Sequence, residues 1–190
     1  MSRGETPDEI FRRIGYDPKL TPHSTTGFHG TSEDNGGDIK RNGFDFDRCK
    51  CGLFGRGAYF YEDKPHPGAK AAVYFIQKWR KHPNVAVIVA NLAMQEAFDL
   101  ISAEENRNFF NTLQQILIDM AMERGVISSL DPTTIGTATV EFIVKYCSAA
   151  HKMQGVRATF RMPEFNPSFQ QGACVREAKC ISIVEKISVN

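Results

Sequence analysis

The chain has 190 residues, of which 42% are hydrophobic, 24% charged and 11% aromatic. This apolar fraction is ordinary for a globular protein and excludes disorder along the whole chain, and the length favours one domain over residues 1–190. Lys and Arg together number 23 and Asp and Glu 22, giving a formal net charge of +1. No global electrostatic field therefore favours nucleic acid or a membrane surface.

The pattern of apolar residues and cysteines bears on where the protein works. No apolar run approaches the ~20 residues that a membrane span needs, and residues 1–13 lack the apolar stretch of a signal peptide. The five cysteines are sparse and odd in number, which disfavours a disulfide scaffold. We expect a cytoplasmic monomer, or one delivered into a host cell by a route that reads other signals, without a membrane segment or a DNA-binding module.

The first third of the chain alternates short helices and strands. Thr6, Pro7 and Glu9 are typical of a helix N-terminus, and Gly15 and Gly43 of helix ends. In chain order we predict a helix over 7–15, a loop over 18–26, a strand over 27–31, a helix from Ser32 or Asp34 to Gly43, a half-buried strand over 44–47, a glycine-rich loop over 49–57 and a strand over 58–61.

The rest of the chain is rich in helix until strands return near its end. Ser102 and Glu105 have the spacing of a capping box. We predict a helix over 69–81, a buried strand over 85–89, a helix from this capping box to Gly125, mainly helix over 133–151, a strand over 156–160, and a final pair of strands at 174–176 and 181–189 joined by a tight turn. Strands at both ends with helices between them favour the α+β class. Residues 92–165 are interpreted as a helix-rich insertion.

Two segments in the first third carry residues suited to binding a ligand. His29 stands between Phe28 and Gly30, where a glycine allows close approach to the main chain. The alternative is a histidine at a strand end that is satisfied by a carbonyl group. The glycine loop then leads into a strand on which Tyr59 and Tyr61 face opposite to Phe60. Tyr59 could offer a flat wall to a planar ring, and the alternative is a core aromatic residue.

A third segment begins the helix predicted at residue 69. Tyr74 lies fifteen positions after Tyr59 and could face back toward it. Taken by itself, Tyr74 is best explained as an ordinary core tyrosine.

Together the three segments resemble the NAD-binding half of the poly(ADP-ribose) polymerase-like, diphtheria-toxin-type ADP-ribosyltransferases. That family carries a His-Gly-Thr/Ser segment, a Gly-x-Gly-x-Tyr-Phe segment and a Lys-Ser-x-x-Tyr segment in this order. Here the segments read His29-Gly30-Thr31, Gly55-Arg56-Gly57-Ala58-Tyr59-Phe60 and Lys70-Ala71-Ala72-Val73-Tyr74. The match covers about residues 27–75 and implies an ADP-ribosyltransferase-like fold of split antiparallel β-sheets with flanking helices.

The resemblance also implies roles for individual residues. His29 would bond the adenosine ribose, and the backbone of Gly30 would hold the nicotinamide amide. Thr31 would bond the ribose or the amide, and Tyr59 and Tyr74 would enclose the nicotinamide ring.

Phe60 is the last residue of the second segment and is counted among the binding residues. The third segment departs from the family at Ala71. The family's serine, which bonds the nicotinamide amide, is replaced here by Ala71. One amide contact is therefore lost or supplied elsewhere, at a cost of about 0.5–1.5 kcal/mol.

The remaining catalytic group would be a carboxylate. Cleaving the bond between nicotinamide and ribose builds positive charge on the sugar, which a nearby carboxylate stabilises most in the transition state. Family members with polymerase-type activity carry a glutamate at the start of a late strand. Aligning that strand with the turn before Ile181 puts Gln171 at the position, whereas requiring a carboxylate puts Glu177 there. Both are kept as candidates, and a glutamine there would suggest transfer of a single unit at most.

We therefore predict an NAD-dependent enzyme that transfers one ADP-ribose unit to a protein side chain and releases nicotinamide, as a toxin or effector would. The acceptor could be ubiquitin or another host protein. The alternatives are a catalytically silent module that binds NAD, ADP-ribose or a protein, an NAD glycohydrolase, and a transferase acting on RNA ends, whose arginine-rich pattern is not in place. We expect no metal, because Cys49-x-Cys51 lacks a second close pair of ligands.

Overall fold

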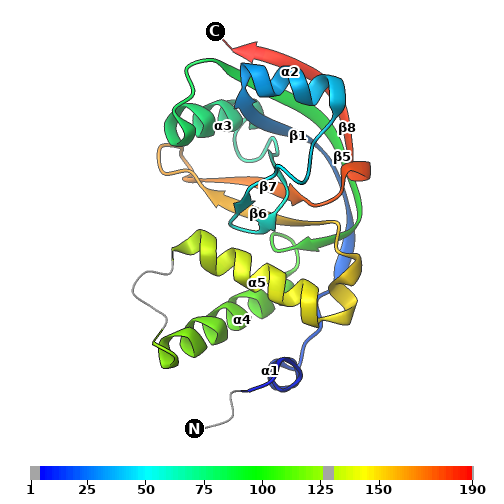
Figure 1. Ribbon diagram of the computed structural model, residues 1–190, viewed down its shortest axis with the longest axis vertical. Helices are drawn as coiled ribbons and strands as arrows, with labels where there is room; N and C mark the ends of the chain where they lie inside the picture. The colour runs from blue at the N-terminus through cyan, green and yellow to red at the C-terminus, as the bar shows by residue number, and fades with distance from the viewer. Residues whose placement is uncertain (1–4, 126–130, 190) are drawn as a thin grey trace.

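The structure is a computed structural model that describes residues 5–125 and 131–189 (Figure 1). Its helices are α1 (Pro7–Ile14), α2 (Glu33–Asn42), α3 (Gly68–Phe75), α4 (Glu104–Glu123) and α5 (Pro132–Tyr146), with short helical turns at Ile76–Arg80, Ser148–Lys152 and Ala178–Cys180. The main sheet comprises β1 (Leu20–Ser32), β4 (Ala58–Tyr61), β5 (Val85–Asp99), β6 (Gly155–Arg161), β7 (Phe169–Val175) and β8 (Ile181–Val189), and β2 (Cys51–Gly52) pairs with β3 (Gly55–Arg56).

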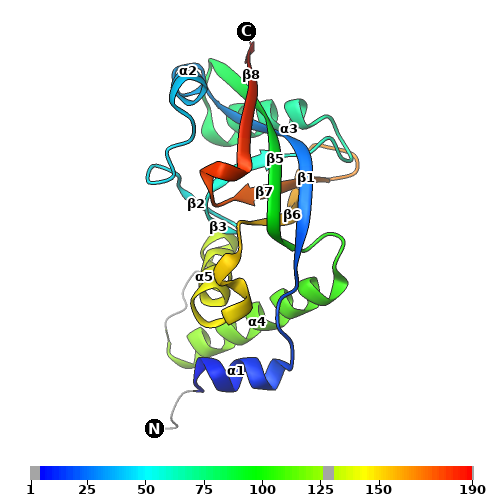
Figure 2. The same cartoon turned by 90° about the vertical axis from the view of Figure 1, so that its right-hand side faces the viewer.

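The main sheet is divided into two layers. β1, β5 and β8 form an antiparallel layer, and β4, β7 and β6 form a second layer that crosses it (Figure 2). The layers join at the pair Phe28–Tyr61 and where Ala97–Asp99 runs parallel to Gly155–Arg157. The predicted α+β class is confirmed. The sheet is mixed rather than antiparallel, because β6 runs parallel to the last residues of β5, Ala97–Asp99.

Helix boundaries follow local capping chemistry. The predicted N-cap of α1 is confirmed, since the Thr6 and Glu9 side chains bond reciprocally to each other's backbone N–H groups. Of the two candidate caps for α2, Ser32 takes the role, and its hydroxyl accepts a bond from the Asn35 N–H. Gly43 ends α2 with a φ of 80°, a backbone angle that favours glycine.

Two expectations in the first third are wrong because longer-range or side-chain contacts decide the conformation. Residues 20–26, predicted as loop, belong to β1, which pairs with β5 from Leu20 to Ser32. The polar residues in this part of β1 give no strand pattern in the sequence, and the segment is a strand because β5 pairs with it. Residues 44–47, predicted as a strand, form a turn in which the Asp45 carboxylate accepts bonds from the N–H groups of Asp47 and Arg48.

Two expectations in the later part are also wrong. The N-cap of α4 is Ala103, without a side-chain bond, because the Ser102 N–H bonds Asp99 and its hydroxyl accepts from Arg157. The last two strands form no hairpin: β7 pairs with β4 and β6, whereas β8 pairs with β5.

The helix-rich segment predicted over 92–165 contains α4 and α5. Its first residues, 92–99, complete β5, and residues 155–161 form β6.

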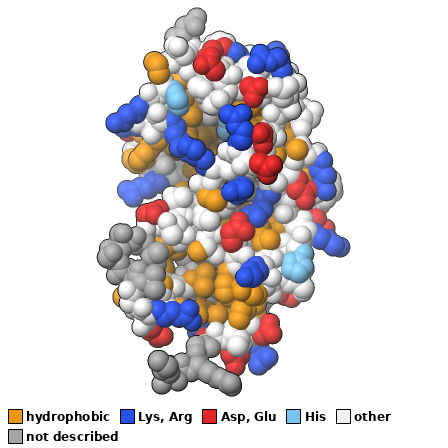
Figure 3. All heavy atoms as spheres, in the orientation of Figure 1, with side chains coloured by type: hydrophobic (Ala, Val, Ile, Leu, Met, Phe, Trp, Pro, Cys, Tyr) orange, Lys and Arg blue, Asp and Glu red, His pale blue; other side chains and the backbone are white. Residues whose placement is uncertain are grey.

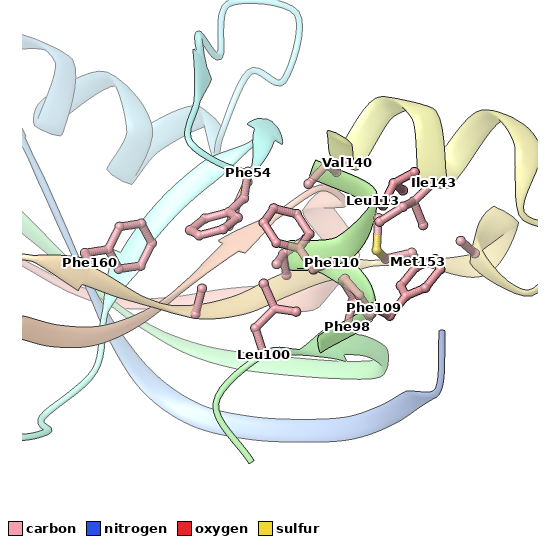
Figure 4. Close-up of a cluster of buried hydrophobic side chains, with 14 of the residues drawn as sticks. Phe54, Phe98, Leu100, Phe109, Phe110, Leu113, Val140, Ile143, Met153 and Phe160 are labelled. Atoms are coloured by element: carbon pink, nitrogen blue, oxygen red, sulfur yellow. The ribbon is translucent and has the colours of Figure 1, made fainter. Parts of the chain in front are cut away.

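The largest buried cluster lies where α4 and α5 pack beneath the second layer (Figure 4). Phe110 of α4 and Phe160 of β6 both lie against Phe54, with ring centroids 6.0 and 5.6 Å away. Hydrophobic burial therefore fixes the two long helices to the sheet and to the loop that carries Phe54. No helix among residues 5–125 and 131–189 combines the length and hydropathy needed to cross a membrane.

Arg157 joins the two layers through a buried ionic network. Its Nε lies 3.0 Å from Glu62 Oε1 and its Nη1 lies 3.2 Å from Asp99 Oδ2. His23 Nε2 lies 3.0 Å from the same Glu62 oxygen, and Gln171 Oε1 accepts a bond from Arg157 Nη2 at 3.0 Å. The network thus links β1, β5, β6 and β7 with the residue that follows β4.

Replacing Arg157 should destabilise the fold strongly. Its side chain is only 12% exposed, and Arg157→Met would leave Glu62 and Asp99 as buried charges without their shared cation. We expect a loss of about 3–5 kcal/mol in the free energy of unfolding, measured by urea denaturation. Arg161→Met, at an exposed position of the same strand, is the control. Equal losses in the two variants would contradict this account of the network.

Candidate functional site

His29 lies near the point where β1 and β4 separate. Its Nδ1 is 2.8 Å from the carbonyl oxygen of Tyr59. A carbonyl oxygen only accepts, so Nδ1 carries the proton and donates this bond. Burial lowers the pKa of His29, although the bond to Tyr59 opposes the shift, so the ring is neutral at pH 7. Nε2 is then left as an acceptor for a hydroxyl group.

Aromatic side chains surround the His29 ring. Phe44 lies edge-on to it at 5.1 Å between centroids, and Phe60 lies at 5.7 Å. Phe60 is fully buried in a separate, smaller hydrophobic cluster that includes Leu92 and Cys180, and its ring centroid lies 5.3 Å from that of Phe44. The structure therefore places Phe60 as a packing residue beside His29.

The two faces of the β1–β5–β8 layer separate the predicted site residues. Gly30 faces α3 so closely that a Cβ there would collide with the Ala72 carbonyl oxygen. His29 and Thr31 alternate with it along the strand and therefore face the opposite side, where α2 lies. Thr31 is buried there, and its methyl group borders Gly36 of α2. On the α3 face, the helix itself occupies the space next to Gly30.

The Tyr59 side chain is held beneath the glycine-rich loop. Its hydroxyl accepts a bond from the Phe54 N–H at 2.9 Å and donates one to the Gly55 carbonyl at 2.8 Å. Its ring lies edge-on to Phe160 at 6.0 Å. Burial, followed by the nearby Cys174 thiol, raises the pKa of Tyr59 above its ordinary value, so the phenol is neutral at pH 7.

Tyr74 and Ala71 lie in different surroundings on α3. Ala71 is fully buried in the main core, whereas Tyr74 is partly exposed and lies edge-on to Phe165 at 5.1 Å. Tyr74 lines a groove of about 730 Å³ between α3, the turn before β7 and the ends of β5 and β8. The groove is lined by His66, Ala69, Lys70, Val73, Tyr74, Gln77, Val87, Glu164, Phe165, Asn166, Ile187 and Val189.

The groove is lined by the charged side chains of Lys70 and Glu164 and by apolar side chains such as Val87. Lys70 Nζ lies 5.5 Å from the Phe165 ring centroid, and Glu164 pairs with Lys78 at 2.7 Å. Basic side chains are numerous on the upper half of the face in Figure 3, while hydrophobic side chains form a patch on its lower half. The groove therefore offers an aromatic wall beside cationic groups, a setting suited to a planar ligand with an anionic group.

The two candidates for the third catalytic position occupy different environments. Gln171 belongs to the Arg157 network, and its main chain also bonds Lys64 and Glu62 on both sides. Glu177 follows β7, where its carboxylate lies 2.8 Å from Lys179 Nζ and 3.2 Å from Gln154 Nε2. Glu177 is the more accessible group, with a side chain 39% exposed.

The structure thus brings together only some of the predicted residues. It joins the first two motif segments through the bond between His29 and the Tyr59 carbonyl. The two tyrosines do not enclose a common space: Tyr59 packs on Phe160, and Tyr74 packs on Phe165 in a groove that neither His29 nor Tyr59 lines. The cause is the position of α3, which covers Gly30 and turns Tyr74 outward.

The buried carboxylate Glu62 was not singled out from the sequence. Its only local signal is its place directly after the strand Ala58–Tyr61, and its partners His23 and Arg157 are remote in the chain. Within the described ranges, no group of three or more His, Cys, Asp and Glu side chains is placed to hold a metal ion.

Comparison with known proteins gives a fold relationship. No protein-family model matches the chain, and no curated protein matches it by sequence. Among solved structures, the chain is similar to a chain of the MbcT–MbcA toxin–antitoxin complex of M. tuberculosis, with a TM-score of 0.52. The likeness covers 97% of this chain and 94% of the other at 12% sequence identity, so it concerns the fold alone.

Stability should depend on acid through Glu62. Burial alone would raise its pKa, but hydrogen bonds from His23 and Arg157 outweigh it and lower the pKa to about 2. Because the folded value lies below the unfolded value of about 4.3, the stabilisation is complete above that pH and is lost as pH falls toward 2. We expect about 3 kcal/mol to be lost over this window in urea titrations. Glu62→Gln should lack this component, and an unchanged acid profile in that variant would contradict the assignment.

Proposed function

We propose that the protein is an NAD-dependent mono-ADP-ribosyltransferase that modifies a protein side chain. The observation that carries the proposal is the state of His29. The second motif segment holds its Nδ1 through the Tyr59 carbonyl at 2.8 Å and leaves Nε2 as an acceptor. A ribose hydroxyl of NAD could donate to that nitrogen, which is the role the motif resemblance implies. The likeness of fold to a chain of a toxin–antitoxin complex supports a toxin.

The reaction would cleave the bond between the nicotinamide nitrogen and the ribose carbon. Nicotinamide leaves with the bonding electron pair, the acceptor's nucleophilic atom forms the new bond to the ribose, and the acceptor's proton passes to solvent. Positive charge develops on the sugar, and a carboxylate such as that of Glu177 would stabilise it. Gln171 could only orient a hydroxyl group, since it carries no charge.

The remaining contacts implied by the resemblance are not gathered around His29. Tyr74 and Lys70 lie in the α3 groove, which neither His29 nor Tyr59 lines, so they are not placed to contact NAD held at His29. Ala71 is buried and has no hydroxyl, and the Gly30 face is covered by α3. In this proposal Tyr59 acts through its backbone carbonyl. The acceptor is a protein of the target cell, with ubiquitin as one candidate.

NAD binding should stabilise the protein through His29. A ligand at one hundred times its Kd adds about 2.7 kcal/mol to stability, so NAD or a tight-binding nicotinamide mimic should raise the melting temperature. His29→Ala should abolish most of this shift, because the ribose acceptor is gone. His151→Ala, at an exposed position, is the control and should keep it. No shift at millimolar NAD with the unaltered protein would count against NAD as substrate.

Separate exchange of the third-position candidates should identify the catalytic group. With labelled NAD, Glu177→Ala should lower turnover by about 10²-fold or more if this carboxylate stabilises the sugar cation. Gln171→Ala should mainly reduce stability by loosening Arg157. Full activity in both variants would place the third catalytic group elsewhere.

A second candidate function is a catalytically silent module that binds NAD, ADP-ribose or a protein. The arrangement of Tyr59 favours it, because its hydroxyl is fully engaged by the loop. The loss of the motif serine at Ala71 favours it as well. Labelled NAD separates the candidates: modified protein indicates the transferase, free nicotinamide without modified protein indicates a glycohydrolase, and binding without turnover indicates the module.

A further inference from the structure

The glycine-rich loop before β4 is gripped from two sides. On one side, the Tyr59 hydroxyl of β4 bonds both the Phe54 N–H and the Gly55 carbonyl. On the α5 side, the Thr137 hydroxyl donates to the Gly52 carbonyl at 2.6 Å. Gly136 lies next to Thr137 and so close to the Leu53 carbonyl that a Cβ there would collide with it. α5 therefore rests directly on the main chain of the loop.

Packing reinforces this grip. Phe54 is 9% exposed and inserts between Phe110 of α4 and Phe160 of β6. On the outer side, the ion pair between Glu141 of α5 and Arg176 spans 3.1 Å beside Gly55. The loop is thus fixed to helices that lie between β5 and β6 in the chain, and the bonded residues Gly52 and Thr137 are 85 positions apart.

The loop is mechanically connected to the His29 ring. Tyr59 bonds the loop with its side chain and His29 with its main-chain carbonyl. A displacement of the loop therefore pulls on the Tyr59 side chain, and Tyr59 also carries the carbonyl that sets the orientation and proton position of the imidazole. Contacts of this kind position a ligand-binding group without touching the ligand.

We infer that α5, through Thr137, sets the position of the His29 ring, which makes Thr137 a positioning residue of the site. The inference rests on the proposed function only for its effect on NAD. Removing the Thr137 hydroxyl leaves the Gly52 carbonyl without this donor, and the loop then samples positions in which the Tyr59 carbonyl no longer holds Nδ1 of His29 in place.

The test compares three variants on the same helix. Thr137→Val removes the hydroxyl at nearly constant volume, and Thr137→Ser restores it. Thr139→Val is the matched control. It also removes a threonine hydroxyl from α5, but this hydroxyl bonds the Ile135 carbonyl within the helix rather than the loop. For Thr137→Val we expect amide exchange at Phe54 to quicken by about tenfold, the factor for one lost hydrogen bond. The NMR signals of the His29 ring should shift as well.

The outcomes separate the inference from the proposed function. Thr137→Ser should return both signals to those of the unaltered protein, and Thr139→Val should leave them unchanged. If Thr137→Val changes neither signal, or Thr139→Val changes both equally, the inference is overturned. If the unaltered protein turns over NAD, Thr137→Val should raise KM for NAD more than it lowers kcat.

If the unaltered protein does not turn over NAD, the proposed function fails, and the amide exchange at Phe54 and the NMR signals of the His29 ring still decide the inference.

Discussion

The buried network around Arg157 is the constraint on which the arrangement of the two layers depends. Its guanidinium carries the positive charge that two nearly buried carboxylates require, Glu62 at 4% and Asp99 at 11% side-chain exposure. Buried charges are tolerated only when paired and hydrogen-bonded, so these groups admit few other relative positions. Because Glu62 directly follows Tyr61, which pairs with Phe28, the network also fixes β4 against β1 one residue away from His29.

This geometry places His29 and Tyr74 on opposite faces of the first layer, whereas the motif resemblance would place both in one pocket. The His29 ring and its aromatic neighbours lie on the α2 face of the first layer, and Tyr74 lines the groove on the α3 side. Tyr59 serves as the connection between the loop and His29, with its phenol engaged by backbone groups. The candidate site is therefore one imidazole that is held by the Tyr59 carbonyl and flanked by the rings of Phe44 and Phe60, while Tyr74 lies outside it in the α3 groove.

Features that depend on neighbouring residues could be predicted from the sequence. The cap at Thr6, the helix end at Gly43 and the opposed faces of Tyr59 and Phe60 follow from local chemistry. The first two motif segments are neighbours in the structure, because the His29 ring bonds the Tyr59 carbonyl, and a binding site shared by the two residues stays a prediction.

Features that depend on remote partners could not be predicted. The polar residues 20–26 form a strand only because β5 pairs with them, and β7 and β8 follow one another in the chain yet join different layers. The direction of the Tyr59 phenol depends on a loop that α5 holds through Thr137. No local pattern marks Arg157 as the partner of Glu62, because 95 residues separate them.

The close approach of α3 to Gly30 has a consequence for how mutants of the His-Gly-Thr segment would be interpreted. Any side chain at this position would meet the helix backbone at Ala72 and the side chain of Ile76. The packing of α3 therefore requires glycine at position 30, whether or not the protein binds a dinucleotide. An inactive alanine variant at residue 30 would report a displaced helix, and assigning chemistry to this segment calls for changes to the imidazole, which leave the helix where it is.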